Sequence, residues 1–75
     1  MSLISQLQSR FDSIQKQIDT DVINATTKSE LEILDSKIYW NSPMEMPLEH
    51  YLIDMVDRSV ITIDDAETKF RTLQS

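Results

Sequence analysis

The sequence contains neither glycine nor cysteine among its 75 residues, and each absence excludes whole classes of function. The short loop motifs that bind nucleotide phosphates need glycine, because only a residue without a side chain lets the backbone approach the anion closely. Without cysteine there is no zinc ribbon, no redox Cys-x-x-Cys pair, no thiol nucleophile and no disulfide. We therefore expect no nucleotide cofactor bound in this way, and we take the cytoplasm as the default location.

Long hydrophobic runs are also missing. No run of apolar residues exceeds three, as in Tyr51-Leu52-Ile53, whereas a membrane-spanning helix needs ~20. The first six residues, Met-Ser-Leu-Ile-Ser-Gln, have neither the basic flank nor the apolar centre of a secretory signal, so we interpret them as the start of the domain itself. We expect no membrane partner.

Positive charge is scarce, since 7 Lys and Arg stand against 13 Asp and Glu and the net charge is −6. Residues 41–75 contribute −4 of this charge and residues 1–40 contribute −2. A surface of this sign repels phosphate backbones and anionic lipid, so we expect no direct contact with nucleic acid. An acidic domain can instead bind a basic partner or mimic DNA. The acids here are interspersed with bases rather than set in rows, which disfavours mimicry.

The small size predicts one domain of marginal stability, spanning residues 1–75. A chain of this length buries roughly 60% of the surface that its unfolded form exposes. Apolar burial then barely exceeds the entropy of ordering, and no disulfide is available to supplement it. A partner chain is therefore expected.

The clearest periodic pattern is an apolar seam at the front of the chain. Its members are separated by 3, 4, 3 and 4 residues: Ile4, Leu7, Phe11, Ile14 and Ile18. The pattern predicts a helix over about 2–23 with Ser2 as N-cap and Asn24 closing its C-terminus, and Val22 and Ala25 continue the stripe. Such a seam is either ordinary core or half of a homodimer face. We favour self-association, because the stripe is narrow and the helix is the longest in the chain.

Three further helices are predicted over about 28–40, 47–58 and 63–73, with a connector at 41–47. The second begins with a Thr-x-x-Glu capping box at Thr27, and the third places Pro47 in its first turn. The fourth begins at the N-cap Thr62, with Ile61 placed to pack on Ala66. The predicted fold is all-α, a small bundle of three to four helices in two hairpins that dimerisation can complete.

Aromatic residues and methionines gather on and around the connector. Those that we select as a candidate partner surface are Tyr39, Trp40, Met44 and Met46; Pro47 and Tyr51 lie close by. Such residues are enriched in interface cores, which is compatible with a docking patch. The alternative is that they cover the end of the helical core, and we favour it because the domain has little apolar bulk.

Groups able to carry chemistry are few. His50 shares a helix face with Asp54, but two ligands do not make a metal site. The adjacent Asp64 and Asp65 suit the first turn of a helix better than acid–base catalysis, and no serine shares a local motif with His50. We expect no enzymatic activity, no catalytic residue, no cofactor and no metal.

The stretch 52–67 resembles a helix-corner-helix phrase that occurs in short oligomerisation modules and in small phage structural proteins, where glycine is usual at the position of Ser59. The phrase consists mostly of capping chemistry and assigns no family. We therefore expect a small protein–protein interaction module (an adaptor, assembly factor or regulatory subunit) that forms a homodimer or higher homo-oligomer. The alternative is an acidic regulator, encoded by a phage or mobile element, that binds a basic nucleic-acid-handling protein and blocks its DNA or RNA surface.

Overall fold

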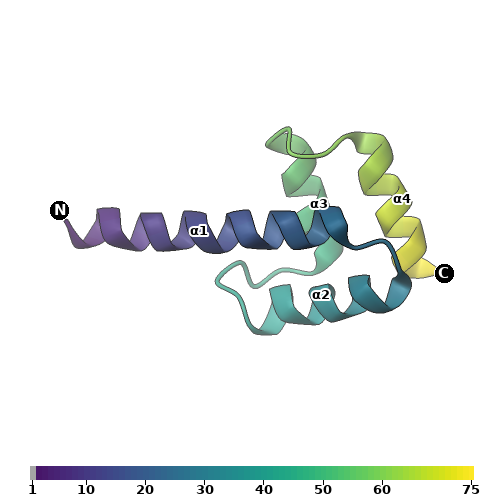
Figure 1. Cartoon of the computed structure of the whole chain (residues 1–75), viewed down its shortest axis with the longest axis horizontal. Helices are drawn as coiled ribbons and strands as arrows, with labels where there is room; N and C mark the ends of the chain where they lie inside the picture. The colour runs from purple at the N-terminus through teal and green to yellow at the C-terminus, as the bar shows by residue number, and fades with distance from the viewer. Residues whose placement is uncertain (1) are drawn as a thin grey trace.

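The computed structural model describes residues 2–75, and within them the chain forms four helices and no strand (Figure 1). These are α1 (Leu3–Asn24), α2 (Lys28–Trp40), α3 (Leu48–Asp57) and α4 (Ile63–Gln74). The prediction of an all-α fold with four helices is confirmed, and each predicted boundary lies within one residue of the observed one.

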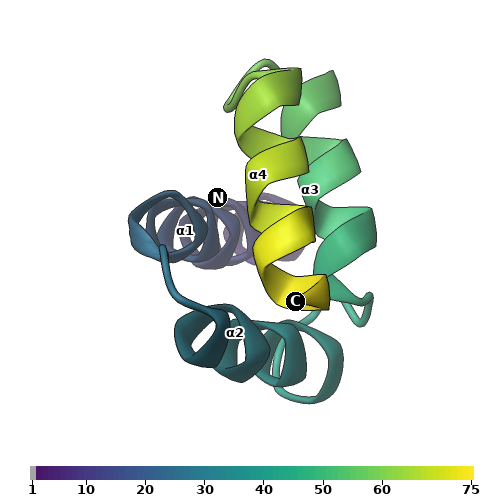
Figure 2. The ribbon, with the colours of Figure 1, turned by 90° about the vertical axis from the view of Figure 1, so that its right-hand side faces the viewer.

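The helices form two antiparallel hairpins that cross each other (Figures 1 and 2). In the first, α2 runs back beside the second half of α1. In the second, α3 and α4 lie side by side, and α2 packs against both of them. The α1–α2 hairpin thus forms within one chain.

The core lies where the two hairpins meet. Its buried side chains come from α1, α2, α3 and the α1–α2 turn: Ile18, Val22, Ala25, Leu31, Leu34, Ile38, Leu48, Tyr51, Leu52 and Met55. Helix α4 contributes no fully buried residue and rests on this core through the half-buried Ala66 and Leu73. Each fully buried aliphatic side chain stabilises the fold by about 1.5–3 kcal/mol, so stability resides mainly in the first three helices.

Local capping chemistry sets the starts of α1, α2 and α4 as predicted. The Ser2 hydroxyl accepts a hydrogen bond from the Ser5 N–H at 3.2 Å. Thr27 and Glu30 form the reciprocal capping box of α2, and the Thr62 hydroxyl accepts from the Asp65 N–H at 3.1 Å. These bonds satisfy donors that have no partner inside the helix.

Two predicted ends are wrong in detail. Asn24 does not adopt a left-handed cap; it is the last helical residue. Ala25 follows with extended backbone, and its buried methyl group joins the core. Pro47 stands just before α3 rather than in its first turn. The Leu48 N–H is instead satisfied by the Asp35 carboxylate of α2 at 2.7 Å, a cap supplied from another helix.

Helix α3 ends in a Schellman motif with a left-handed residue. The Val60 N–H donates to the Met55 carbonyl at 2.8 Å and the Ser59 N–H to the Val56 carbonyl at 2.9 Å. Ser59 has φ 63°, a region in which glycine is normally found. The motif reverses the chain and directs α4 back along α3.

Candidate interaction surfaces

The first half of α1 extends beyond the other helices, and we call residues 3–14 the α1 arm (Figure 1). With 22 residues against 13, α1 is too long for α2 to cover its whole length. Along the arm, Ile4 is 79% exposed, Leu7 54% and Ile14 39%, while Phe11 is half-buried. Four of the five predicted seam residues therefore form an apolar stripe outside the core.

The fifth seam residue belongs to the core. Ile18 is 2% exposed, and Val22 one turn later is fully buried. The same helical stripe is therefore buried inside the domain from Ile18 onward and lies outside the core before Ile18.

A polar cluster that the sequence pattern did not reveal ties the covered half of α1 to α3. The Tyr51 hydroxyl donates to Asp19 Oδ1 at 2.6 Å and to the Gln15 carbonyl at 3.2 Å. Arg58 donates to both oxygens of Asp19, at 2.8 and 3.0 Å, and to Asp54 at 2.7 Å. These bonds join α1 to α3 and its C-cap directly after the arm.

The electrostatics of this cluster follow from burial and hydrogen bonding. Burial raises the pKa of the Asp19 carboxyl, but hydrogen bonds from Arg58 and Tyr51 and the Arg58 charge together bring that pKa below its ordinary value. Burial and the neighbouring Asp19 carboxylate raise the pKa of Tyr51. Hydrogen bonds to Asp19, opposed by burial and aided by Asp54, raise the pKa of Arg58. At neutral pH the cluster is therefore an ion pair completed by a neutral phenol.

Lys69 of α4 forms hydrogen bonds with the C-terminal end of α1. Its ammonium group donates to the Ala25 carbonyl at 2.6 Å and to the Ile23 carbonyl at 3.3 Å. A cation at this position also interacts favourably with the C-terminal end of the helix dipole.

The predicted connector patch is divided by the fold. Met44 and Met46 are half-buried and pack against the core. Trp40 is 75% exposed and Tyr39 44%, and their rings meet edge to face with centroids 4.7 Å apart. Trp40 is therefore available to a partner over most of its surface, and Tyr39 over somewhat less than half.

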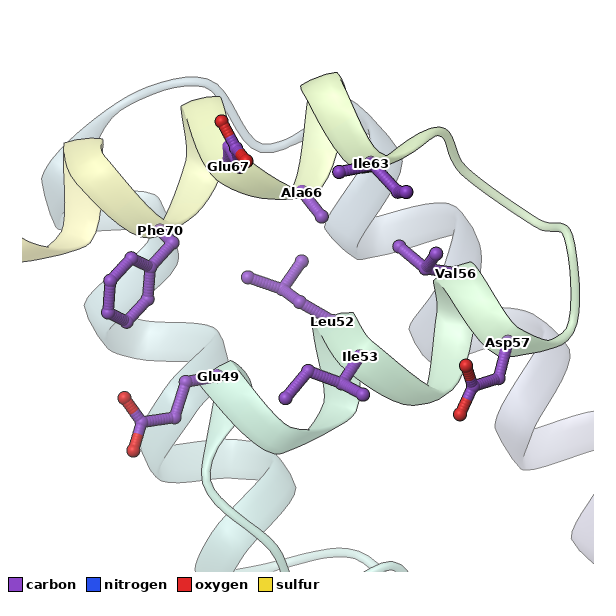
Figure 3. A pocket seen from close by; sticks show the side chains of 9 residues that line it. All are labelled: Glu49, Leu52, Ile53, Val56, Asp57, Ile63, Ala66, Glu67 and Phe70. Atoms are coloured by element: carbon purple, nitrogen blue, oxygen red, sulfur yellow. The ribbon is translucent and has the colours of Figure 1, made fainter.

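An apolar groove between α3 and α4, with a volume of about 350 Å³, was not predicted (Figure 3). The α3 side is formed by Leu52, Ile53 and Val56, and the α4 side by Ile63, Ala66 and Phe70. The buried Leu52 lies between the two helices, whereas Ile53 is 60% exposed and Ile63 64%. The core covers Leu48, Tyr51, Leu52 and Met55 of α3, whereas the neighbouring Ile53 stays exposed and lines the groove.

Carboxylates surround this groove. Glu49, Asp57 and Glu67 lie around its margin, and no basic residue lines it (Figure 3). Glu67 forms an exposed ion pair with Arg71 at 3.4 Å. Across residues 2–75, none of the ion pairs involves Glu49 or Asp57. We call the lining and its margin the acid-rimmed groove.

The residues considered for chemistry are dispersed. His50 is exposed on α3, and Asp54 is engaged by Arg58 rather than by the imidazole. Asp64 and Asp65 occupy the first turn of α4, as their position after Thr62 predicts. In the described part of the chain, no group of three or more His, Asp or Glu side chains is placed to hold a metal ion.

Within residues 2–75, no helix combines the length and the apolar character needed to cross a membrane. Comparison with protein family models, curated proteins and solved structures gave no match for this chain.

Proposed function

We propose that this protein is a non-enzymatic protein–protein interaction module that self-associates through the apolar stripe of the α1 arm. The observation that supports this proposal most directly is that Ile4, Leu7 and Ile14 are exposed on a helix that extends beyond the other three helices. A contiguous exposed apolar stripe of this kind is typical of an interaction site. An adaptor, assembly factor or regulatory subunit acting in the cytoplasm fits this arrangement.

Helix energetics support the proposal. A segment as short as the arm is marginally helical in water unless packing stabilises it. Ser2 caps the first turn of the arm, and the Asp19 cluster anchors the part of α1 that follows the arm, so both flanks favour its helical form. Burying the stripe against another chain adds the hydrophobic stabilisation that the small core lacks.

The test is the absolute mass in solution measured by light scattering on a sizing column. The unaltered chain is expected to form a dimer or larger assembly, and Leu7→Asp to yield the monomer, because a carboxylate cannot be buried in an apolar contact. Ser9→Asp is the matched control, since it adds the same charge on the opposite face of the arm and should leave the mass unchanged. A monomeric parent chain at high concentration would refute self-association.

A second candidate function is the acidic regulator that blocks a basic nucleic-acid-handling protein. The acid-rimmed groove is the observation that favours it, because apolar lining surrounded by carboxylates suits a basic amphipathic helix. Tyr39 and Trp40 remain the predicted docking residues for a different protein. Binding by this route should weaken steeply as salt rises, whereas an apolar contact should persist.

A further inference from the structure

Two unpartnered apolar surfaces lie on this one chain, and they are opposite in shape. The α1 arm is a ridge formed by a single helix, and the acid-rimmed groove is a trough between two helices (Figures 1 and 3). The arm is part of one continuous helix that extends away from α3 and α4, so it does not reach the groove of its own chain (Figure 1). Only a second copy can bring the two surfaces together.

Charge disfavours pairing of the groove with another groove. Two such surfaces facing each other would place Glu49, Asp57 and Glu67 of one chain opposite the same carboxylates of the other. Like charges brought close together in an interface from which water is excluded are destabilising. The groove therefore needs an occupant that is neutral or basic.

The charges of the arm meet this requirement. Between residues 2 and 15 the only charged side chains are Arg10 and Asp12. At about 100° per residue, Arg10 lies about 80° from the centre of the apolar stripe, at its flank, whereas Asp12 lies about 120° from that centre on the other side. The arm thus presents apolar side chains with a cation beside them.

Buried area also favours the groove over a second arm. A stable interface buries ~800 Å² on each partner. Pairing of two arms covers one narrow stripe on each chain, and it leaves both grooves exposed. Insertion of each arm into the other chain's groove covers two stripes and two grooves.

We infer that the acid-rimmed groove receives the α1 arm of a second copy of this chain, with the stripe against Leu52 and Ile53 and Arg10 at the carboxylate rim. The inference rests on the proposed self-association and names the surface that the arm meets. The contact joins two different surfaces, so it closes into a pair when the two copies are related by a twofold axis and otherwise extends into a chain of copies.

The decisive experiment mixes two variants that are each defective in one surface. Leu7→Asp disrupts the apolar stripe of the arm and leaves the groove intact. Ile53→Asp disrupts the groove and leaves the arm intact. Each variant alone is expected to bind itself at least tenfold more weakly, and an equimolar mixture to regain association through the one intact arm and the one intact groove. Light scattering and native mass spectrometry, with the two variants differing in isotope label, measure the heterodimer.

Two further variants separate loss of the groove contact from misfolding and from a general effect of an added surface charge. Ile53 and Ile63 are both largely exposed, so Ile63→Asp serves as a second groove variant if Ile53→Asp fails to fold. Ile33→Asp is the matched control, because Ile33 is 67% exposed on α2 and belongs to neither surface. This control should associate like the parent chain.

Cross-linking gives an independent readout, since the chain has no cysteine of its own. Leu7→Cys mixed with Ile53→Cys should form a disulfide between the two variants. Either variant alone should form little disulfide-linked dimer. Undiminished self-association of both groove variants, or a dominant cross-link of Leu7→Cys with itself, would overturn the inference while leaving self-association through the arm in place. A parent chain that stays monomeric would overturn both.

Discussion

At the scale of single residues, the fold depends on a few side chains whose roles are not evident from the neighbouring sequence. Ser59 occupies a left-handed position that glycine normally fills, and Asp19 is an acid held inside by two donors. Asp35 accepts the first N–H of a helix to which it does not belong. Each makes a contribution that can be measured by one substitution.

Replacing Ser59 with glycine should stabilise the protein by about 0.5–1 kcal/mol. The left-handed conformation costs a residue with a side chain about 1–2 kcal/mol, and the greater chain entropy of unfolded glycine offsets part of the gain. Urea denaturation measures the change. Ser36→Gly, the same substitution inside α2, should destabilise by about 0.5 kcal/mol; destabilisation at both positions would contradict the strain assigned to Ser59.

Replacing Asp19 with asparagine should destabilise the protein at pH 7 by about 1–3 kcal/mol, because Arg58 loses its buried counter-charge. The folded pKa of Asp19 lies below its ordinary value, so its ionised form stabilises the fold above that ordinary value. This stabilisation is lost as the pH falls from about 4 through the lower folded pKa.

Thermal unfolding as a function of pH checks the sign of this effect. The parent chain should lose more stability than Asp19→Asn as the pH falls below about 4. Asp12→Asn, on the exposed side of the arm, should follow the parent profile. Parallel profiles of the parent and Asp19→Asn would show that the carboxylate is not held by Arg58.

At the scale of elements, α1 is one helix with two roles. Its first turns carry exposed apolar residues, and its last turns supply Ile18 and Val22 to the core. Helix periodicity is the same along its whole length, so the pattern predicts the face but not where along the helix burial begins. The length of α2 and the position of Tyr51 set that point.

Two identical substitutions on α1 should separate its roles. Ile18→Ala should cost about 2–5 kcal/mol, because it leaves a cavity in the core. Ile4→Ala should change the monomer's stability by less than about 0.5 kcal/mol, because Ile4 is already 79% exposed. Denaturation at protein concentrations too low for association measures both, and equal costs would refute the division of the helix.

At the scale of the whole molecule, a small core coexists with uncovered apolar surface. The described chain measures 46 × 24 × 17 Å, elongated by the arm. The acids of residues 41–75 keep one end negative, while the arm is nearly neutral. This asymmetry allows contact between unlike ends of two molecules and opposes contact between like acidic ends.

Self-association should persist or tighten when sodium sulfate is raised at constant pH. Sulfate strengthens apolar burial and screens the repulsion between acidic chains, which outweighs the weakened attraction of Arg10 to the rim. Light scattering at low and high salt gives the mass directly. An assembly that dissociates at high salt would indicate a contact held by charge instead.

Local sequence signals are sufficient to predict the four helices and the capped starts of α1, α2 and α4. Capping and helical periodicity act over three or four residues, so Thr27 with Glu30, Thr62 with Asp65, and the stripe from Ile4 to Ile18 could be interpreted without a structure. The all-α class followed from these local signals.

The way in which these helices meet depends on contacts between residues far apart in the sequence. The Asp19 cluster joins residues 32 and 39 positions apart, and Asp35 caps a helix 13 positions away. The acid-rimmed groove exists because α3 and α4 lie side by side. Such contacts depend on the angles and offsets between helices, which are set by the whole core and are not encoded in any short stretch of sequence.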